Sequence, residues 1–147
     1  MTSRAEAIAG ALVAALTVPP MSAVPAARVF RDLDGALQSA LLPAVAVEIG
    51  DEDPPTIGAP HGVADRLLSV TVSIVAEASA GGSPYTAADA ALIEAHARTV
   101  ADREFGGLAF DTTEGRTARD RDAGERHLGV VRKEYRIHYR TTEDSIE

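Results

Sequence analysis

The 147-residue sequence contains no cysteine and no tryptophan, and its aromatic side chains are limited to three tyrosines and three phenylalanines. Without cysteine the chain can form no disulfide, no thiolate metal site and no cysteine nucleophile. So few aromatic rings leave little for the stacking platforms on which single-stranded nucleic acids bind. Lysine is also scarce, because Lys133 is the only one. These absences exclude several classes of site before any motif is considered.

Acidic residues outnumber basic ones, and the formal net charge is −8 at pH 7. Such a surface repels phosphate backbones, which disfavours general binding to nucleic acids or to anionic membranes. The apolar stretch from Ala5 to Val18 is shorter than the roughly 20 residues of a membrane span, so we expect no membrane partner. With 46% hydrophobic and 24% charged residues, the chain is typical of a folded protein, and its length predicts a single domain over residues 1–147.

Two segments have the signals of a helix. Ser3 and Glu6 form an S-x-x-E capping box ahead of an apolar stripe, which predicts a helix over residues 5–18 that ends at the diproline 19–20. Thr86 and Asp89 suggest a second cap, followed by a helix over residues 87–103.

Alternation and β-branched residues predict the strands. The expected strands are residues 28–30, 44–49, 67–76, 108–112 and 128–140. The order of the elements predicts an α+β fold, in which two helices pack on one face of an antiparallel or mixed sheet of four to five strands.

Three segments are predicted to lie outside this core. Residues 50–62 are rich in Asp, Pro and Gly, and we expect a flexible loop. The last strand would span about 43 Å, more than such a domain can cover, so the charged residues 114–126 should project as an arm or form an extended hairpin. We expect the acidic tail 143–147 to be frayed.

No pattern of catalytic or metal-binding residues is found. His61, His96, His127 and His138 lack the spacing of metal ligands, and the segment 120–125 departs from the spacing of a calcium loop. His96 lies at the edge of an apolar helical stripe, where a packed, hydrogen-bonded side chain is expected. Motifs for a serine nucleophile or a phosphate-binding loop are absent. We therefore predict no catalytic residue, no cofactor and no metal, and we expect a protein that is not an enzyme.

The basic residues of the last strand recur on one face. Arg132, Arg136 and Arg140 follow at intervals of four, which is compatible either with an ordinary solvated sheet face or with an assembly surface whose guanidinium groups pair with carboxylates of a neighbouring subunit. The long strand and the charged arm favour assembly. The predicted subunit-interface residues are Arg119, Arg121, Asp122, Arg126, Arg132, Arg136 and Arg140.

Several strings, in this order, carry a family resemblance. They are the alanine-rich first helix, Arg28–Asp32, Leu42–Glu48, Pro60–Gly62 before Asp65–Val70, Phe105–Leu108, Asp122–Arg126 and Tyr135–Thr141. In this arrangement the chain resembles the tail terminator, or minor tail completion, proteins of long-tailed bacteriophages and related gene-transfer particles.

The resemblance implies a structural virion protein that forms a homo-hexameric ring on the head-proximal end of the tail tube. Such a ring ends tube polymerisation and joins the tail to the head, so the implied partners are other copies of the chain, the tail tube protein and a head or neck completion protein. DNA would pass through the lumen without specific binding, and the protein would be in the host cytoplasm during assembly. Two alternatives stay open: another head–tail connector or tail tube component, and a small-molecule-binding α+β domain in which His61 and the acidic loop would form the site.

Overall fold

A computed structural model describes residues 1–38, 42–57, 62–78, 81–121 and 127–146 of the chain. In this part of the chain a mixed six-stranded sheet is combined with three α-helices, which confirms the predicted α+β class. The strands are β1 (Val29–Phe30), β2 (Ala44–Glu52), β3 (Thr56–Ile57), β4 (Val63–Glu77), β5 (Asp111–Arg121) and β6 (Leu128–Thr142). The helices are α1 (Arg4–Thr17), α2 (Leu33–Leu37) and α3 (Pro84–Ala101), with a 3-10 turn at Ala26–Arg28.

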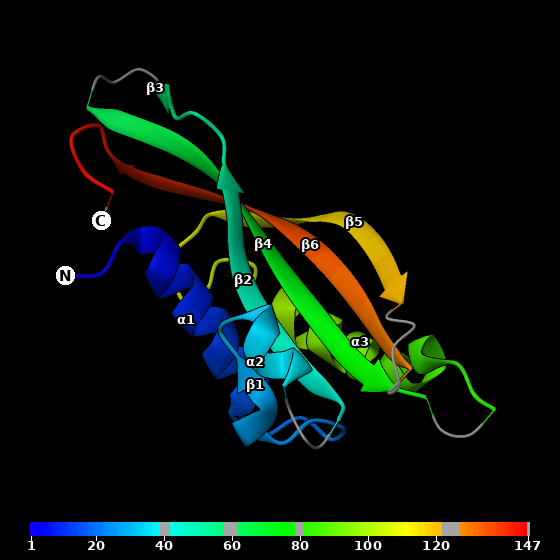
Figure 1. The fold of residues 1–147 in the computed structure, drawn as a ribbon. Helices are drawn as coiled ribbons and strands as arrows, with labels where there is room; N and C mark the ends of the chain where they lie inside the picture. The colour runs from blue at the N-terminus through cyan, green and yellow to red at the C-terminus, as the bar shows by residue number, and fades with distance from the viewer. Residues whose placement is uncertain (39–41, 58–61, 79–80, 122–126, 147) are drawn as a thin grey trace.

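The centre of the sheet is a long antiparallel pair. The strand order is β1-β2-β4-β6-β5, with β3 also paired to β4, and β1 with β2 is the parallel pair. β4 and β6 pair along their whole length, from Val63 opposite Thr142 to Glu77 opposite Leu128 (Figure 1). The predicted strand 28–30 is present as β1, and the sheet has one strand more than predicted because β3 is only two residues long and gives too little sequence signal.

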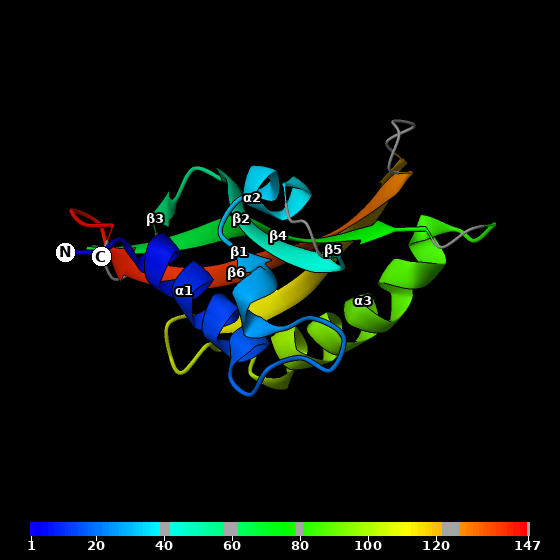
Figure 2. The same cartoon turned by 60° about the horizontal axis from the view of Figure 1, so that its bottom comes forward.

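The two faces of the sheet are covered unequally. α1 and α3 lie together on one face, as predicted, and bury the main core against alternate residues of β2, β4 and β6 (Figure 2). The short helix α2 packs on the other face in a smaller apolar cluster, and it was not predicted because five residues are too few for a helical periodicity. We call the face with α1 and α3 the helical face, and the other the open face.

The N-terminal caps of the helices differ in part from the prediction. Ser3 Oγ accepts a hydrogen bond from Glu6 N at 3.2 Å, as expected of a capping box. The Glu6 carboxylate, however, pairs with Arg31 at 2.9 Å. The cap of α3 is Ser83 rather than Thr86, because Pro84 suits the first position of a helix, where no N–H is needed.

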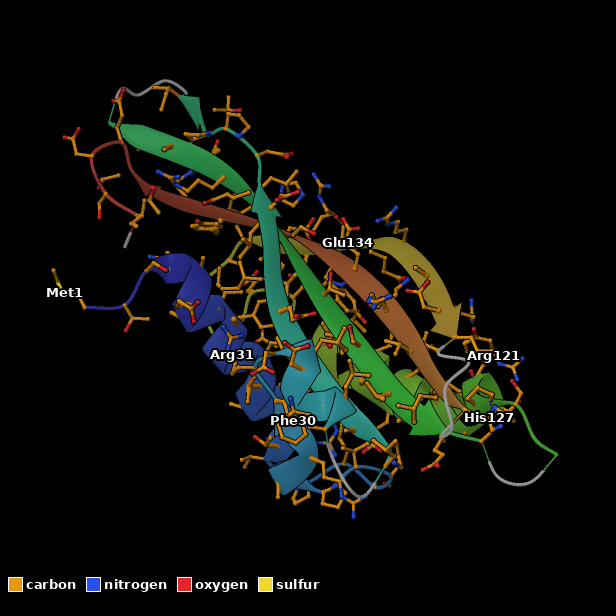
Figure 3. The ribbon with its side chains drawn as sticks, viewed as in Figure 1. Met1, Phe30, Arg31, Arg121, His127 and Glu134 are labelled. Atoms are coloured by element: carbon orange, nitrogen blue, oxygen red, sulfur yellow. The ribbon has the colours of Figure 1, made fainter. Side chains whose placement is uncertain are left out.

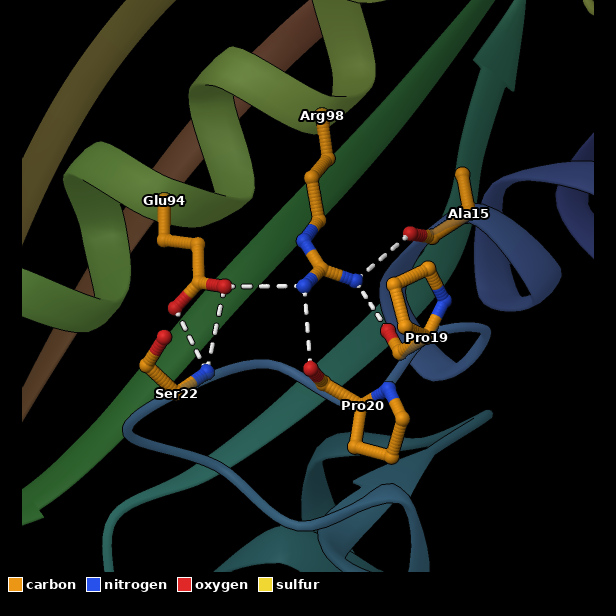
Figure 4. A network of polar contacts seen from close by, with 6 residues as sticks. All are labelled: Ala15, Pro19, Pro20, Ser22, Glu94 and Arg98. Carbon is orange, nitrogen blue, oxygen red and sulfur yellow. Dashed lines mark hydrogen bonds and ion pairs between the residues drawn. The ribbon is translucent and has the colours of Figure 1, made fainter.

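Arg98 of α3 ties the two long helices together (Figure 4). Its guanidinium lies at the C-terminal end of α1, where the last carbonyls have no partner within the helix. It donates 3.3 Å to Ala15 O and 3.0 Å to Pro20 O, it also contacts Pro19 O, and it pairs with Glu94 at 2.9 Å. The diproline segment that ends α1, as predicted, is thereby fixed to α3.

Two of the segments predicted to lie outside the core make backbone hydrogen bonds to distant parts of the chain. In the region 50–62, β2 continues to Glu52 and Asp53 N donates to Leu67 O at 3.0 Å, so residues 50–52 are strand rather than loop. The flexibility of the region stays a prediction, and residues 58–61 lie outside the described part. The tail is held as well, because Ile146 O accepts from Arg4 N at 2.9 Å. Local composition does not reveal such long-range backbone hydrogen bonds.

The charged arm is an edge strand through Arg121. β5 runs antiparallel to β6, from Asp111 opposite His138 to Arg121 opposite Gly129, with an irregularity between Glu114 and Thr117. The extended-hairpin form of the prediction is therefore confirmed, although the strand begins and ends later than the expected 108–112. Residues 122–126, including Asp122 and Arg126 of the predicted interface, lie outside the described part of the chain.

Candidate functional site

The surface at β5 brings together most of the unusual features of the described chain. β5 pairs only with β6 among the described strands, so its other edge is unpaired. Near its start the edge is partly occupied, because Arg103 donates to Thr112 O at 2.9 Å. An unpaired edge of this length is a template for addition of another strand, which charged side chains and bulges oppose. β5 has both the free edge and these protective features.

The predicted interface residues do not form one surface. Arg119 lies opposite Val131, a core residue, and so projects on the helical face. Arg132 and the two arginines that follow it at intervals of four alternate with the core residues of β6 and occupy the open face, where Figure 3 also shows Glu134. Arg121 ends β5, opposite Gly129. The sequence placed these arginines in one set because the pairing that separates them is long-range.

The arginines of the open face pair with carboxylates of their own chain. Arg132 contacts Asp120, and Arg136 reaches Asp53 at 2.9 Å. Arg140 lies opposite Asp65 in the register, and its Nε is 2.6 Å from the carboxylate. This guanidinium holds the pKa of Asp65 below its usual value, mainly through the hydrogen bond. The row is thus compensated within the subunit, and whether it also meets a neighbouring subunit stays a prediction.

A hollow of about 250 Å³ opens on the same face beside Phe110. Pro54, Leu67 and His138 also line it. Phe110 is 49% exposed, the Arg140 guanidinium lies 5.5 Å from its ring centroid, and its ring is 5.8 Å from that of His138. An exposed aromatic side chain under a cation is a suitable contact for an apolar group of a partner or a ligand.

His96 is packed and hydrogen-bonded, as predicted. Its Nδ1 lies 2.9 Å from the hydroxyl of Tyr135 and its Nε2 lies 3.5 Å from Glu114. Burial raises the pKa of Tyr135 to about 12. Lys133 Nζ lies 2.8 Å from Glu114, and this bond lowers the pKa of the Glu114 carboxyl.

This cluster was not found from the sequence, although a signal was present. Lys133 stands between Val131 and Tyr135 on the apolar face of β6, where an isolated cation requires a carboxylate partner. Its side chain is only 13% exposed. The sequence does not reveal that this partner is Glu114 of β5.

The remaining expectations about chemistry concern absences. Among the described residues no group of three or more His, Asp or Glu side chains could hold a metal ion. In the same part of the chain, no helix is long and apolar enough to cross a bilayer. His61, the centre of the alternative ligand site, lies outside the described residues, and Asp53 of the acidic loop is paired with Arg136.

Comparison with known proteins gives a structural likeness at low sequence identity. No protein-family model matches the chain. No curated protein is significantly similar to it. Among solved structures, a chain in the virion of a native gene transfer agent particle aligns with 15% identity and a TM-score of 0.48, covering 95% of this chain and 96% of that one. A likeness at this level does not bear on function.

Proposed function

We propose that the protein is a structural component of a virion, and that it caps the head-proximal end of a phage-type tail tube as a ring. In this role it ends polymerisation of the tube and provides the joint to the head or neck. Its partners are other copies of itself, as a homo-hexamer, together with the tail tube protein and a head completion protein. The family resemblance of the sequence implies this role, and the geometry of the sheet supports it.

The observation that carries the proposal is the asymmetry of the two sheet edges. One edge is the eleven-residue strand β5. At the other edge, the two-residue strand β1 covers only Val45 and Ala46 of β2. A subunit that binds its two neighbours through two different sheet edges makes head-to-tail contacts. Such contacts generate a ring when the rotation from one subunit to the next leads back to the first subunit.

The charge of the chain fits a channel through which DNA passes. A net charge of −8 gives a surface that repels the phosphate backbone. We therefore propose a lumen that DNA traverses without specific binding.

The decisive experiment locates the protein in particles. Disruption of its gene should give overlong or headless tails, and immunogold labelling should place the protein at the head-proximal tip of tails from the parent. Normal particles after disruption would contradict the proposal. Label along the whole tube would favour the tube subunit instead, and label at the head vertex would favour a different connector.

A small-molecule function has one observation in its favour, the hollow beside Phe110. Binding there would raise the melting temperature of the purified protein in a metabolite screen, and Phe110→Ala would abolish that rise. An unchanged melting temperature across the screen would remove this alternative.

A further inference from the structure

A second hollow, of about 210 Å³, lies on the helical face between α3 and β5. α3 runs beneath β5 and β6, so the hollow adjoins the unpaired edge of β5 (Figure 2). The residues that line it and are used below are Ile93, His96, Glu114, Arg119 and Lys133.

The hollow has an excess of positive charge. Lys133 and Glu114 compensate each other at 2.8 Å. Arg119 is exposed, and it has no ion pair among the described residues. Its guanidinium is available for the two parallel hydrogen bonds that a carboxylate accepts.

The rim of the hollow is apolar. Ile93 of α3 is 64% exposed and is among the few large apolar side chains at the described surface. An apolar wall beside an uncompensated cation suits a segment that presents a carboxylate next to an apolar group. The adjacent β5 edge offers backbone hydrogen bonds to such a segment if it is extended.

We propose that this hollow receives an acidic side chain of a second copy of the chain, whose extended segment lies along the free edge of β5. The inference rests on the proposed ring and deepens it by naming the contact between neighbours. Identical copies with a net charge of −8 repel one another unless a basic site on one meets the acidic surface of the next. Because the basic hollow and the acidic surface that meets it are different parts of the molecule, the contact is head-to-tail.

The test is self-association of the full chain, measured by sedimentation velocity over a concentration series at low and high salt. We expect the wild type to associate, less strongly at high salt. Arg119→Glu should weaken association at least about tenfold, since it places like charges together. The matched control is Arg116→Glu on the same strand, whose side chain is 85% exposed and reaches only Glu134, at 3.7 Å. We expect less than about a twofold effect for the control.

Two outcomes would overturn the inference. One is a wild type that stays monomeric at every concentration, and the other is an equal effect of the two charge reversals. Ile93→Ser provides a second test. Because Ile93 is uncharged, its replacement should weaken association by the same factor at low and at high salt. Melting curves of each variant separate loss of docking from loss of folding. If the association measurements contradict this contact, the proposed function is still tested independently by the location of the protein in particles.

Discussion

The imidazole of His96 stacks on the ring of Tyr135, with centroids 5.9 Å apart and an interplanar angle of 15°. The same imidazole is hydrogen-bonded to the Tyr135 hydroxyl through Nδ1, at 2.9 Å. This contact joins the middle of α3 to the middle of β6, across the interface between helix and sheet. The contribution of this hydrogen bond to stability can be measured by removing the hydroxyl oxygen of Tyr135.

Tyr135→Phe should lower the free energy of unfolding by about 1–3 kcal/mol, because it leaves a half-buried imidazole nitrogen without its partner. Urea unfolding at neutral pH measures the loss. Tyr85→Phe is the control, since this tyrosine is half-buried at the start of α3 and its hydroxyl has no hydrogen bond among the described residues. Equal losses in the two variants would contradict the assigned role.

The same tyrosine gives an alkaline dependence of stability. The pKa of Tyr135 is raised to about 12 in the folded protein, chiefly by burial. A raised folded-state pKa stabilises the protein below the unfolded-state value of about 10, and this contribution is lost as the pH rises from there through the folded-state value. The stability difference between wild type and Tyr135→Phe should therefore shrink between about pH 10 and pH 12, as measured by urea unfolding. A constant difference would contradict it.

The Glu114–Lys133 pair gives the opposite dependence, in acid. The Lys133 ammonium lowers the pKa of the Glu114 carboxyl, so the pair stabilises the folded state above the ordinary carboxyl pKa and loses that effect as the pH falls through the lowered value. The melting temperature of Lys133→Met should be lower than that of the wild type at neutral pH. The two melting temperatures should converge below about pH 4. Arg116→Met, which removes a cation whose side chain is 85% exposed, serves as a control for general acid effects. Parallel curves down to low pH would contradict the assignment.

Removal of the Arg98 guanidinium should separate α3 from the end of α1. Arg98→Met leaves carbonyl oxygens of Pro20 and Ala15 without a donor, and we expect a loss of about 1.5–3 kcal/mol in unfolding free energy. Arg116→Met, at an 85% exposed side chain, should change it by less than about 0.5 kcal/mol. Chemical unfolding of both variants provides the comparison, and a similar small change in each would show that the tie contributes nothing.

Two glycine substitutions should have opposite signs. A Cβ on Gly129 of β6 would lie 2.7 Å from Cβ of Pro84, so Gly129→Ala should destabilise by about 1–3 kcal/mol. A Cβ on Gly10 of α1 would meet nothing within 4 Å, and Gly10→Ala should stabilise by about 0.5–1 kcal/mol because glycine is the costlier residue inside a helix. Melting temperatures of the two variants decide the matter. A stable Gly129→Ala would mean that α3 starts farther from β6 than described.

The elements predicted correctly are those whose sequence pattern reflects burial. β4 alternates because Val70, Val72 and Ile74 face the main core, and α1 follows a helical stripe for the same reason. β5 was expected only as one of two forms of a charged arm, because Asp111–Arg121 is mostly charged and polar and its strand conformation comes from pairing with β6 rather than from its own residues.

For the candidate site, the sequence predicted the kinds of residue but not their arrangement in space. The sequence indicated arginines near the last strand, and it did not reveal that Arg119 lies on the helical face while Arg136 pairs with Asp53. Both facts depend on register between segments far apart in the chain. Alternation along the sequence predicts which residues of a strand share a face. It does not predict which residues of other strands lie next to them.

The pairing of β4 with β6 along fifteen residues has a consequence for how the molecule folds. Every rung joins positions separated by α3 and β5, from Leu128 on Glu77 outwards to Thr142 on Val63. Such contacts close large loops, and chains dominated by them fold slowly. Before β6 is added, β4 has no partner on one side and α3 and β5 lack the strand on which they pack. The last long strand to be synthesised is therefore the one that makes the domain cooperative.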